Sequence, residues 1–472
     1  MKNSIEIILE EAKKLVRPSD EERVRRLSIA NRIVKLLEEE FSRDSINCEI
    51  SIQGSLAKDT WLPEGKDIDI FLIFPKDFPK ERFEDIIKKL IIVAQKSGIR
   101  WILKYAQHPY VQYIVDKYEI DIVPCYRIEP GEKPLTAADR TPLHTNYVLS
   151  KLSENPDLRD DIRLFKRFLK VLGIYGAEIK VEGFSGYLAE LLILNYGSFI
   201  NLIKDVAERW KPKHIIIDVE KHYSDVKTIK KLFKDSPIIV IDPVDPTRNA
   251  AAAVSVESLS KLILASKLFL HKPDILFFKY PEKYYVDSLE KRFFPPIVVI
   301  EFPYPKKLVP ETVWGEAKRL CRSIWNVLER YEYKPYDVSV WSDEENRIVI
   351  LIMVERDELT PYEFHKGPPV YSNDVLKFLS KYVNDEECLG PYIMDSRVVV
   401  IKRRKYYNVE VLLKAQLPLI APKHFKKLVN NCKIVVLKSV DDIYRLYSDI
   451  RDVLLRFLLK REFWYVNLLK IS

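Results

Sequence analysis

Apolar and polar residues alternate in the stretch that ends near residue 53, and this period of two predicts a β-strand. The apolar positions are Ile46, Cys48, Ile50 and Ile52. Gly54 and Ser55 follow directly, and we expect a small turn there. A second strand is predicted to start at residue 67, where the chain reads Asp-Ile-Asp-Ile. The same period places Asp67 and Asp69 on one face of that strand and their isoleucine neighbours on the other.

Three further strand candidates come after these two, and a helix precedes them. The strands are predicted at 99–105, 110–115 and 119–125, and Asp121 lies in the last of them between two isoleucines. Helical spacing of apolar residues indicates the helix, and these residues are Phe83, Ile86, Ile87, Leu90 and Ile91. Helices are also predicted at 3–16 and 20–41, before the first strand. We therefore expect a small mixed sheet with helices packed on it.

The middle of the chain is predicted to be mainly helical. Apolar spacing indicates helices at 158–172, 185–195 and 199–210. Short apolar runs at 215–219 and 238–241 indicate two strands. The segment 242–249 contains prolines, which continue neither a helix nor a strand, so we predict a loop there.

Beyond residue 255 helices and strands are mixed. After a helix at 255–270, the predicted elements are a strand at 297–302, a helix at 311–331 and strands at 337–342 and 347–355. This order resembles half of an RNA-recognition-type sheet, although the aromatic signature of that module is not visible. Helices are also predicted at 374–382 and 421–429, and a helix of alternating leucines and basic residues ends the chain.

These patterns and the length of 472 residues predict an α+β multidomain protein. A prior of roughly 150 residues per domain suggests about three domains. A polar loop at 129–140 marks the first boundary. We place the second near residue 256, before a helix after which the chain becomes richer in Tyr, Phe, Pro and Lys. We therefore expect domains at 1–140, 141–256 and 257–472.

Composition narrows the class of protein. The five cysteines are odd in number and form no Cys-x-x-Cys pair, which argues against a disulfide framework and a structural zinc site. The 77 basic and 69 acidic residues give a net charge of +8, which permits a nucleic-acid partner without demanding one. No apolar run approaches the roughly 18 residues of a membrane span, and the N-terminus does not read as a signal peptide. We expect a cytoplasmic protein with no membrane partner.

The turn and the three aspartates have a common chemical interpretation. A turn of small residues lets backbone N–H groups approach a triphosphate. Carboxylates on neighbouring strands suit two Mg²⁺ ions about 3.5 to 4 Å apart, which activate a hydroxyl and neutralise leaving pyrophosphate. An isolated Asp-x-Asp is more often two solvated side chains. The order of turn, Asp67-x-Asp69 and Asp121 in one predicted sheet favours the metal site.

Several motifs resemble known families. Gly54, Ser55, Asp67, Asp69 and Asp121 resemble the nucleotidyltransferase superfamily that includes DNA polymerase beta and the eukaryotic poly(A) polymerases. Longer segments resemble the archaeal class I CCA-adding enzyme, a tRNA nucleotidyltransferase. These segments are 54–63, 108–111, 121–126, 139–144, 173–178, 183–188, 242–249 and 367–370. The resemblance is dense through residue 254 and thinner beyond it.

The resemblance implies a fold and an activity. Residues 1–140 would form a polymerase beta-like catalytic head and residues 141–256 a helical neck that binds nucleotide. Residues 257–472 would form an α/β, RNA-recognition-like body and tail that bind tRNA. The activity implied is addition of C, C and A to the 3′ end of tRNA from CTP and ATP, with Mg²⁺ and without a template. Whether the protein forms a homodimer is left undecided by the sequence.

The resemblance also implies roles for single residues. Asp67, Asp69 and Asp121 would be catalytic and hold the metal ions, although the family often has Glu at the first position, where Asp67 is shorter. The residues implied in nucleotide binding are Gly54, Ser55, Lys58, Thr141, His144, Lys166, Tyr175 and Arg248.

Simpler roles stand beside several of these. Thr141 would only start a helix, His144 would be a surface histidine and Lys166 a solvated lysine. Tyr175 would cap an apolar face. Arg248 would pair with a nearby aspartate, Asp242 or Asp245.

A tRNA acceptor arm is the macromolecular partner that we expect. Three segments interleave aromatic rings with cations, which suits RNA, and these are 277–280, 283–285 and 402–407. Such residues also commonly cap the edge of a core. Two rival functions are a poly(A) or poly(U) polymerase with the same carboxylates, and an RNA-binding protein with an inactive transferase fold.

Overall fold

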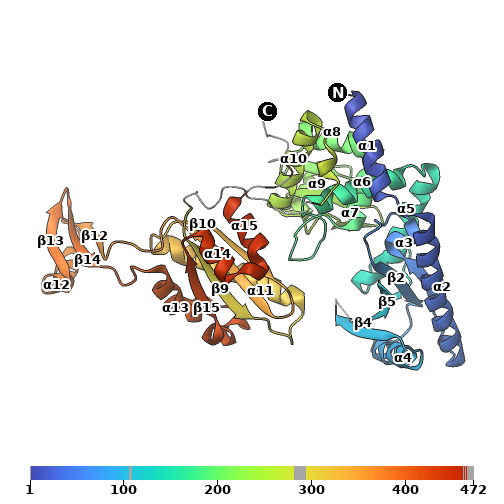
Figure 1. Ribbon diagram of the computed structural model, residues 1–472, viewed down its shortest axis with the longest axis horizontal. Coiled ribbons are helices and arrows are strands. Elements are labelled where there is room, and N and C mark those ends of the chain that lie inside the picture. The colour runs from blue at the N-terminus through green and yellow to red at the C-terminus, as the bar shows by residue number, and fades with distance from the viewer. Residues whose placement is uncertain (1, 106–108, 281–293, 461, 463, 465–472) are drawn as a thin grey trace. The chain divides into compact units, whose positions relative to one another are not determined.

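The computed structural model describes residues 2–105, 109–280, 294–460, 462 and 464 (Figure 1). The chain forms two compact units, one made of residues 1–282 and 463–472 and the other of residues 283–462. The predicted boundaries at residues 140 and 256 stay a prediction.

The first unit contains a five-stranded mixed sheet in the order β1-β2-β5-β4-β3. Its strands are β1 (Glu49–Gln53), β2 (Asp67–Phe74), β3 (Arg100–Tyr105), β4 (Pro109–Val115) and β5 (Tyr118–Tyr126). Strands β2 and β5 are parallel, and the other neighbours are antiparallel. The predicted mixed sheet is confirmed.

One face of this sheet is covered by helices because alternate residues of its strands are apolar. Ile68, Ile70 and Leu72 of β2 are fully buried against α2 (Asp20–Arg43) and α4 (Phe83–Lys96). The helix α1 (Lys2–Val16) precedes α2 and packs on α6 (Leu158–Val171). The opposite face of β2 carries Asp67 and Asp69 at its start, so the strand separates an apolar core from a polar edge.

Helices dominate the rest of the first unit. Five of them share one large core, and they are α5 (Arg140–Glu154), α6, α7 (Gly186–Tyr196), α8 (Phe199–Arg209) and α10 (Val256–His271). Helix α9 (Val226–Leu232) instead packs through Ile229 in a smaller cluster with Ile239 and Ile241. In the described part of the chain, no single helix is long and apolar enough to cross a membrane. The bent pair α7 and α8, at 91°, meets that test by length and composition alone.

The loop predicted at 242–249 is wrong, because this segment forms a hairpin. Strands β7 (Ile238–Asp242) and β8 (Asp245–Asn249) pair through Ile241 with Asn249 and Asp242 with Asp245. With β6 (Ile215–Ile217) they make a sheet in the order β6-β7-β8. Pro246 is tolerated because β8 is an edge strand, where one side of the backbone needs no partner.

The second unit is built on a four-stranded antiparallel sheet in the order β10-β11-β9-β15. Its elements are β9 (Ile297–Pro303), α11 (Pro310–Arg330), β10 (Pro335–Ser342), β11 (Arg347–Val354), α13 (Val409–Ile420) and β15 (Lys433–Leu437). This βαββαβ order is that of ferredoxin-like folds. The RNA-recognition-like architecture is therefore confirmed.

Both faces of that sheet are covered. Val298 and Ile300 of β9 pack toward α11 and α13, whereas Ile297 and Val299 pack toward α14 (Val440–Leu446) and α15 (Arg451–Leu459). RNA-recognition modules stack bases on an open sheet face. Here such a face is filled by apolar side chains, so the likeness is one of architecture.

A smaller sheet is inserted between β11 and α13. It consists of β12 (Tyr362–Pro369), β13 (Cys388–Met394) and β14 (Arg397–Arg403), in the order β12-β14-β13, with α12 (Val375–Tyr382) packed against it. The helix predicted at 421–429 is wrong. The chain there makes two 3₁₀ turns, because Pro422 forces Ala421 out of the helical region, at φ −63° and ψ 135°.

Candidate active site

Three carboxylates meet at the start of β2 and in β5. In the parallel register of these strands Asp69 lies directly opposite Asp121, and Asp67 lies two residues earlier on the same face. Asp67 is exposed, while Asp69 and Asp121 are half-buried. The structure thus brings the three predicted catalytic aspartates to one edge.

Burial and neighbouring negative charges disfavour the charged forms of Asp69 and Asp121. Burial, with added repulsion from Asp121 and Asp67, raises the pKa of Asp69 to about 7. Burial also raises the pKa of Asp121, although Gln112 on β4 donates Nε2–H to its Oδ1 at 2.7 Å and works against this rise. An adjacent cation would relieve this repulsion.

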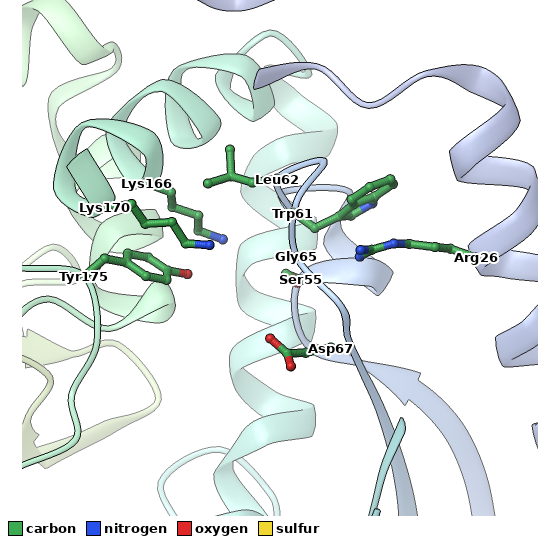
Figure 2. Close-up of a pocket in the computed structure, with 9 residues that line it drawn as sticks. All are labelled: Arg26, Ser55, Trp61, Leu62, Gly65, Asp67, Lys166, Lys170 and Tyr175. Carbon is green, nitrogen blue, oxygen red and sulfur yellow. The ribbon is translucent and has the colours of Figure 1, made fainter. Parts of the chain in front are cut away.

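Gly54 allows the chain to pass beneath Asp69. Its φ is +66°, and an added Cβ would lie 2.0 Å from Asp69 Oδ2, so no other residue fits without a shift. Residues Gly54–Lys58 form the short helix α3 rather than the predicted turn. Ser55 is the second residue of α3 and lines the same cleft as Asp67 (Figure 2).

Two lysines beside the carboxylate edge share one buried glutamate. Lys58 Nζ donates to Glu190 Oε2 at 2.5 Å, and Lys166 Nζ donates to Glu190 Oε1 at 2.8 Å. Thr60 donates its hydroxyl to Glu190 Oε1 at 2.6 Å and accepts from Lys166 Nζ at 3.0 Å. Because Lys166 is only 2% exposed, the alternative of a solvated lysine is wrong.

The lysines and the glutamate shift one another's pKa values. Burial lowers the pKa of Lys166 to about 8, although Glu190 opposes the change. Burial would raise the pKa of Glu190, but Lys166 and Lys58 outweigh it and lower this pKa to about 2. We call Lys58, Thr60, Lys166 and Glu190 the lysine cluster.

Glu190 is a residue that sequence reasoning missed. It is the only charged side chain in the apolar run from Leu188 to Leu194 on α7, and it is 1% exposed. Since glutamate is almost never fully buried without a partner, that lone charge was the available signal. Its partners lie too far away in sequence to be named from the pattern.

Helix α6 fastens the segment that follows α3. Arg159 Nε donates to the carbonyl of Lys58 at 3.2 Å, and Arg163 Nε donates to the carbonyl of Trp61 at 3.2 Å. Lys166 donates to the carbonyl of Thr60 at 3.2 Å. These three cations have helical spacing, so one face of α6 holds residues 58–61 in place.

Figure 2 shows the cleft that opens beside these groups. Its lining residues are Arg26, Ser55, Trp61, Leu62, Gly65, Asp67, Lys166, Lys170 and Tyr175. Lys170 lies over the ring of Tyr175 at 5.4 Å. A Cβ on Gly186 would lie 2.8 Å from the Tyr175 hydroxyl, so Gly186 leaves room for that ring. Tyr175 therefore presents its hydroxyl within the cleft.

A second polar cluster gathers around Asp242 at the end of β7. His144 Nε2 lies 2.9 Å from Asp242 Oδ2, Arg248 donates to the same oxygen at 2.7 Å, and the Tyr187 hydroxyl donates to Oδ1 at 3.1 Å. His144 also stacks on Tyr187, with ring centroids 3.9 Å apart. The alternative that Arg248 pairs with Asp242 is confirmed, while Asp245 pairs with Arg140.

The surroundings of Asp242 and His144 shift the pKa values of both side chains. Burial would raise its pKa, but His144 and Arg248 lower it to about 2. Burial lowers the pKa of His144, so its ring is largely neutral near pH 7. His144 is thus no surface histidine. Thr141 lies in the first turn of α5, as its simpler alternative predicted.

The aromatic and basic segments have internal partners. Phe277 and Phe278 are fully buried, and Tyr280 donates to Glu64 at 3.2 Å. Lys402 and Arg404 pair with Glu363. Residues 283–285 and His108 lie outside the described residues. For 277–280 the core-edge alternative fits best.

The three aspartates do not close around a single point. Among the residues that the structure describes, no three His, Cys, Asp or Glu side chains converge closely enough to hold an ion. Asp121 is turned toward Gln112, as the hydrogen bond above shows. The carboxylates that would bind a metal are therefore neighbours, but their oxygen atoms do not point to one common position.

Three family models match the chain in order. Residues 32–144 match the nucleotidyltransferase domain, residues 160–279 the second domain of tRNA nucleotidyltransferase, and residues 296–436 the C-terminal domain of the CCA-adding enzyme. Among solved structures, a Cid1 poly(U) polymerase with MgGTP bound has a TM-score of 0.48 and 13% identity, covering 58% of this chain and 98% of that one.

Relatives of known name match almost end to end. The CCA-adding enzyme of Pyrobaculum islandicum is 43% identical over 415 residues, which cover 88% of this chain and 94% of that protein. The CCA-adding enzyme of Saccharolobus solfataricus is 37% identical over 419 residues, covering 88% and 92%. With this identity and coverage, the chain belongs to the CCA-adding enzymes, a family of tRNA nucleotidyltransferases.

Proposed function

We propose that this chain adds C, C and A to the 3′ end of tRNA, using CTP and ATP without a template and releasing pyrophosphate. Membership of the CCA-adding family supports the reaction. The observation that carries the site is the register of β2 and β5, which sets Asp69 opposite Asp121 at the edge of a cation-lined cleft.

The aspartates suit a divalent metal. Carboxylate oxygens are hard donors of the kind that Mg²⁺ prefers. The raised pKa of Asp69 reflects burial first and then the negative charges of Asp121 and Asp67, which a cation would balance. Asp67 and Asp69 would hold two ions, and Asp121 would assist one of them after turning from Gln112. When bound, Mg²⁺ activates the 3′-hydroxyl and neutralises the leaving pyrophosphate.

The lysine cluster would bind the triphosphate. Two lysines face one glutamate there, so the cluster carries a net positive charge that favours an anion. Lys166 and Tyr175 line the cleft with Ser55, while Lys58 on α3 pairs with the same Glu190 as Lys166. Gly54 and Ser55 would bring backbone and hydroxyl donors to the same phosphates. The attack on the α-phosphate would then be in line with pyrophosphate departure.

The Asp242 cluster would hold the rest of the nucleotide. Asp242 fixes His144 and Arg248 by hydrogen bonds, which leaves the other guanidinium donors of Arg248, whose side chain is 36% exposed, to reach an incoming base. Thr141 and His144, both on α5, would contact sugar and phosphate. Residues 141–256 would therefore act as a nucleotide-binding neck.

The tRNA acceptor arm would be bound mainly by residues 257–472. The family model for the C-terminal domain supports an assignment of this region to the tRNA enzyme. Lys405 and Tyr407 are exposed, whereas the cations at 402–404 pair with carboxylates. Lys405→Ala should weaken tRNA binding and lower its salt dependence. An unaltered salt slope would refute this placement.

One assay tests the reaction against its rivals. Purified protein and Mg²⁺ are incubated with tRNA ending at the discriminator base, at C or at CC, with CTP and ATP supplied separately and together. Two C additions followed by a single A support the proposal. Long homopolymer tails would instead indicate a poly(A) or poly(U) polymerase, and no incorporation at all would favour an inactive RNA-binding protein.

A further inference from the structure

Arg26 is a buried arginine that faces the cleft and has no role in the site described above. It lies on α2, on the side opposite Lys166 and Lys170, and it is 1% exposed. In Figure 2 its side chain reaches toward Ser55 and Gly65, below the ring of Trp61. Cations therefore approach this cleft from two directions.

The guanidinium of Arg26 is held by rings more than by acceptors. Its Cζ lies 4.0 Å from the centroid of Trp61 and 5.2 Å from that of Tyr118. The nearest carboxylate is Glu22, whose Oε1 is 3.5 Å from Nε. Glu22 is shared, because it also accepts from the Tyr118 hydroxyl at 2.8 Å and pairs with Lys117.

Two donors of this guanidinium are unused. Within the described part of the chain, neither Nε nor Nη2 of Arg26 has a hydrogen-bond partner, although both are buried. A guanidinium stays charged at any pH that proteins tolerate, so it cannot escape the cost of burial by losing its proton. A buried cation with idle donors is stabilised once a ligand supplies oxygen atoms.

The ligand chemistry follows from the neighbours. Arg26 shares the cleft with Ser55, Lys166 and Tyr175, the residues that we assign to the triphosphate. A planar guanidinium matches two phosphate oxygens at once, which a lysine does not. The ring of Trp61 lies 4.0 Å from Arg26 Cζ and holds the guanidinium in place, so the donors are positioned before any ligand arrives.

We propose that Arg26 binds the terminal phosphates of the incoming nucleoside triphosphate and of the pyrophosphate product. This inference rests on the proposed function, because it assigns the same cleft to the triphosphate. Arg26 then closes the cleft from the side of α2, while Lys166 and Lys170 close it from α6. Nucleotides that lack the terminal phosphates do not reach it.

The competing explanation is that Arg26 only anchors Trp61. In that case its loss loosens the segment after α3 and weakens every ligand of the cleft by a similar factor. Phosphate number separates the two explanations, because only a contact to the terminal phosphates depends on it. A direct contact to tRNA would instead change tRNA affinity alone.

The test compares Arg26→Met and Arg26→Lys with Arg25→Met in the full chain. Arg25 neighbours Arg26 on α2 but is 55% exposed and pairs with Asp116 at 3.1 Å, so it controls for the loss of one charge. Calorimetry measures the binding of CTP, CDP, CMP and pyrophosphate to each protein with Mg²⁺, together with the tRNA affinity and the melting temperature.

We expect Arg26→Met to weaken the binding of CTP and of pyrophosphate by about 10- to 100-fold, because hydrogen bonds to a charged group are lost. CMP and tRNA should bind as before. Arg26→Lys should restore only part of the affinity, because it keeps the charge without the fork. Arg25→Met should match the unsubstituted protein.

Two results would overturn the inference. One is a loss of affinity in Arg26→Met that is equal for CTP, CDP and CMP. The other is a normal affinity for CTP in both Arg26 variants. If Arg26→Met does not fold, the comparison of CTP with CMP in Arg26→Lys decides in the same way. An unsubstituted protein that binds no CTP would overturn the proposed function and the inference together.

Discussion

The two main sheets of this protein differ in what covers their faces. In the first unit, α2 and α4 cover one face, and the start of β2 leaves Asp67 and Asp69 on the other. In the second unit, β9 is buried on both faces. Chemistry is therefore expected where a strand keeps a polar edge, and a scaffold where both faces are filled.

Asp69→Ala should produce the largest effect on activity, because it removes a carboxylate from the polar edge. We expect C addition to fall by about a thousandfold or more, since metal-assisted charge stabilisation is worth several kcal/mol. Burial and neighbouring charges already raise the pKa of Asp69, so its loss should not lower the melting temperature. Incorporation rates and thermal melts measure both, and retained transfer would refute the metal assignment.

Glu190→Ala should cost the most stability within the site. It leaves Lys58 and Lys166 buried without their carboxylate, and removal of one partner of a buried pair costs about 3 to 5 kcal/mol. Denaturant unfolding measures this change. Glu190→Gln is the matched variant, and it should be milder because it keeps the acceptor for Thr60. If Glu190→Ala left the free energy of unfolding unchanged, the lysine cluster would not stabilise the fold.

Ile350→Ala should separate the scaffold from the chemistry. Ile350 lies on β11 in the second unit and is fully buried, so the cavity should cost about 2 to 4 kcal/mol of unfolding free energy. Incorporation of C into saturating tRNA at a temperature below unfolding should stay within about twofold. A large loss of the transfer rate in a folded Ile350→Ala protein would contradict the division of roles between the two sheets.

Acid should weaken the first unit through Asp242. Its pKa is about 2 in the folded protein, against 3.8 for a free aspartate, so the folded state holds the carboxylate in its charged form. This stabilisation is present above about pH 4 and is lost as pH falls toward 2, by about 2 kcal/mol in total. Asp242→Asn should flatten that part of the pH profile of stability. If both proteins had the same pH profile of stability, Asp242 would not be the cause of the loss of stability in acid.

The sequence predicted the carboxylate edge because strand alternation is local. The four residues Asp67-Ile-Asp-Ile already show a polar and an apolar face of the strand, and Asp121 between two isoleucines repeats this pattern in β5. The strands β9, β10 and β11 and the helix α11 were also predicted from the sequence alone. Helix α13 was missed, and Pro418 inside it obscures the helical pattern. The β7–β8 hairpin was missed because an edge strand tolerates proline.

The partners of the site were beyond local patterns. Lys58 and Glu190 are 132 positions apart and meet only because α3 packs near α7. Sequence spacing gives no measure of such a distance. Arg26 has the helical spacing of Ile29 and Ile33 on the buried face of α2, which is a local sign of burial. Its ring partners Trp61 and Tyr118 are distant in sequence and were not visible in that pattern. Motif resemblance identified Lys166 and Arg248, and Asp242 was named as one of two possible partners of Arg248, whereas Glu190, the partner of Lys166, was not named.

The grip of α6 on residues 58–61 has a mechanical consequence. Arg159, Arg163 and Lys166 hold three backbone carbonyls of that segment, so the floor and one wall of the cleft move as a rigid body. Opening the cleft between α6 and this segment means breaking hydrogen bonds from cationic side chains to backbone carbonyls, two of which are buried, and this is costly. Substrate exchange should therefore proceed through the opposite rim, and the cleft should keep its width through all three additions.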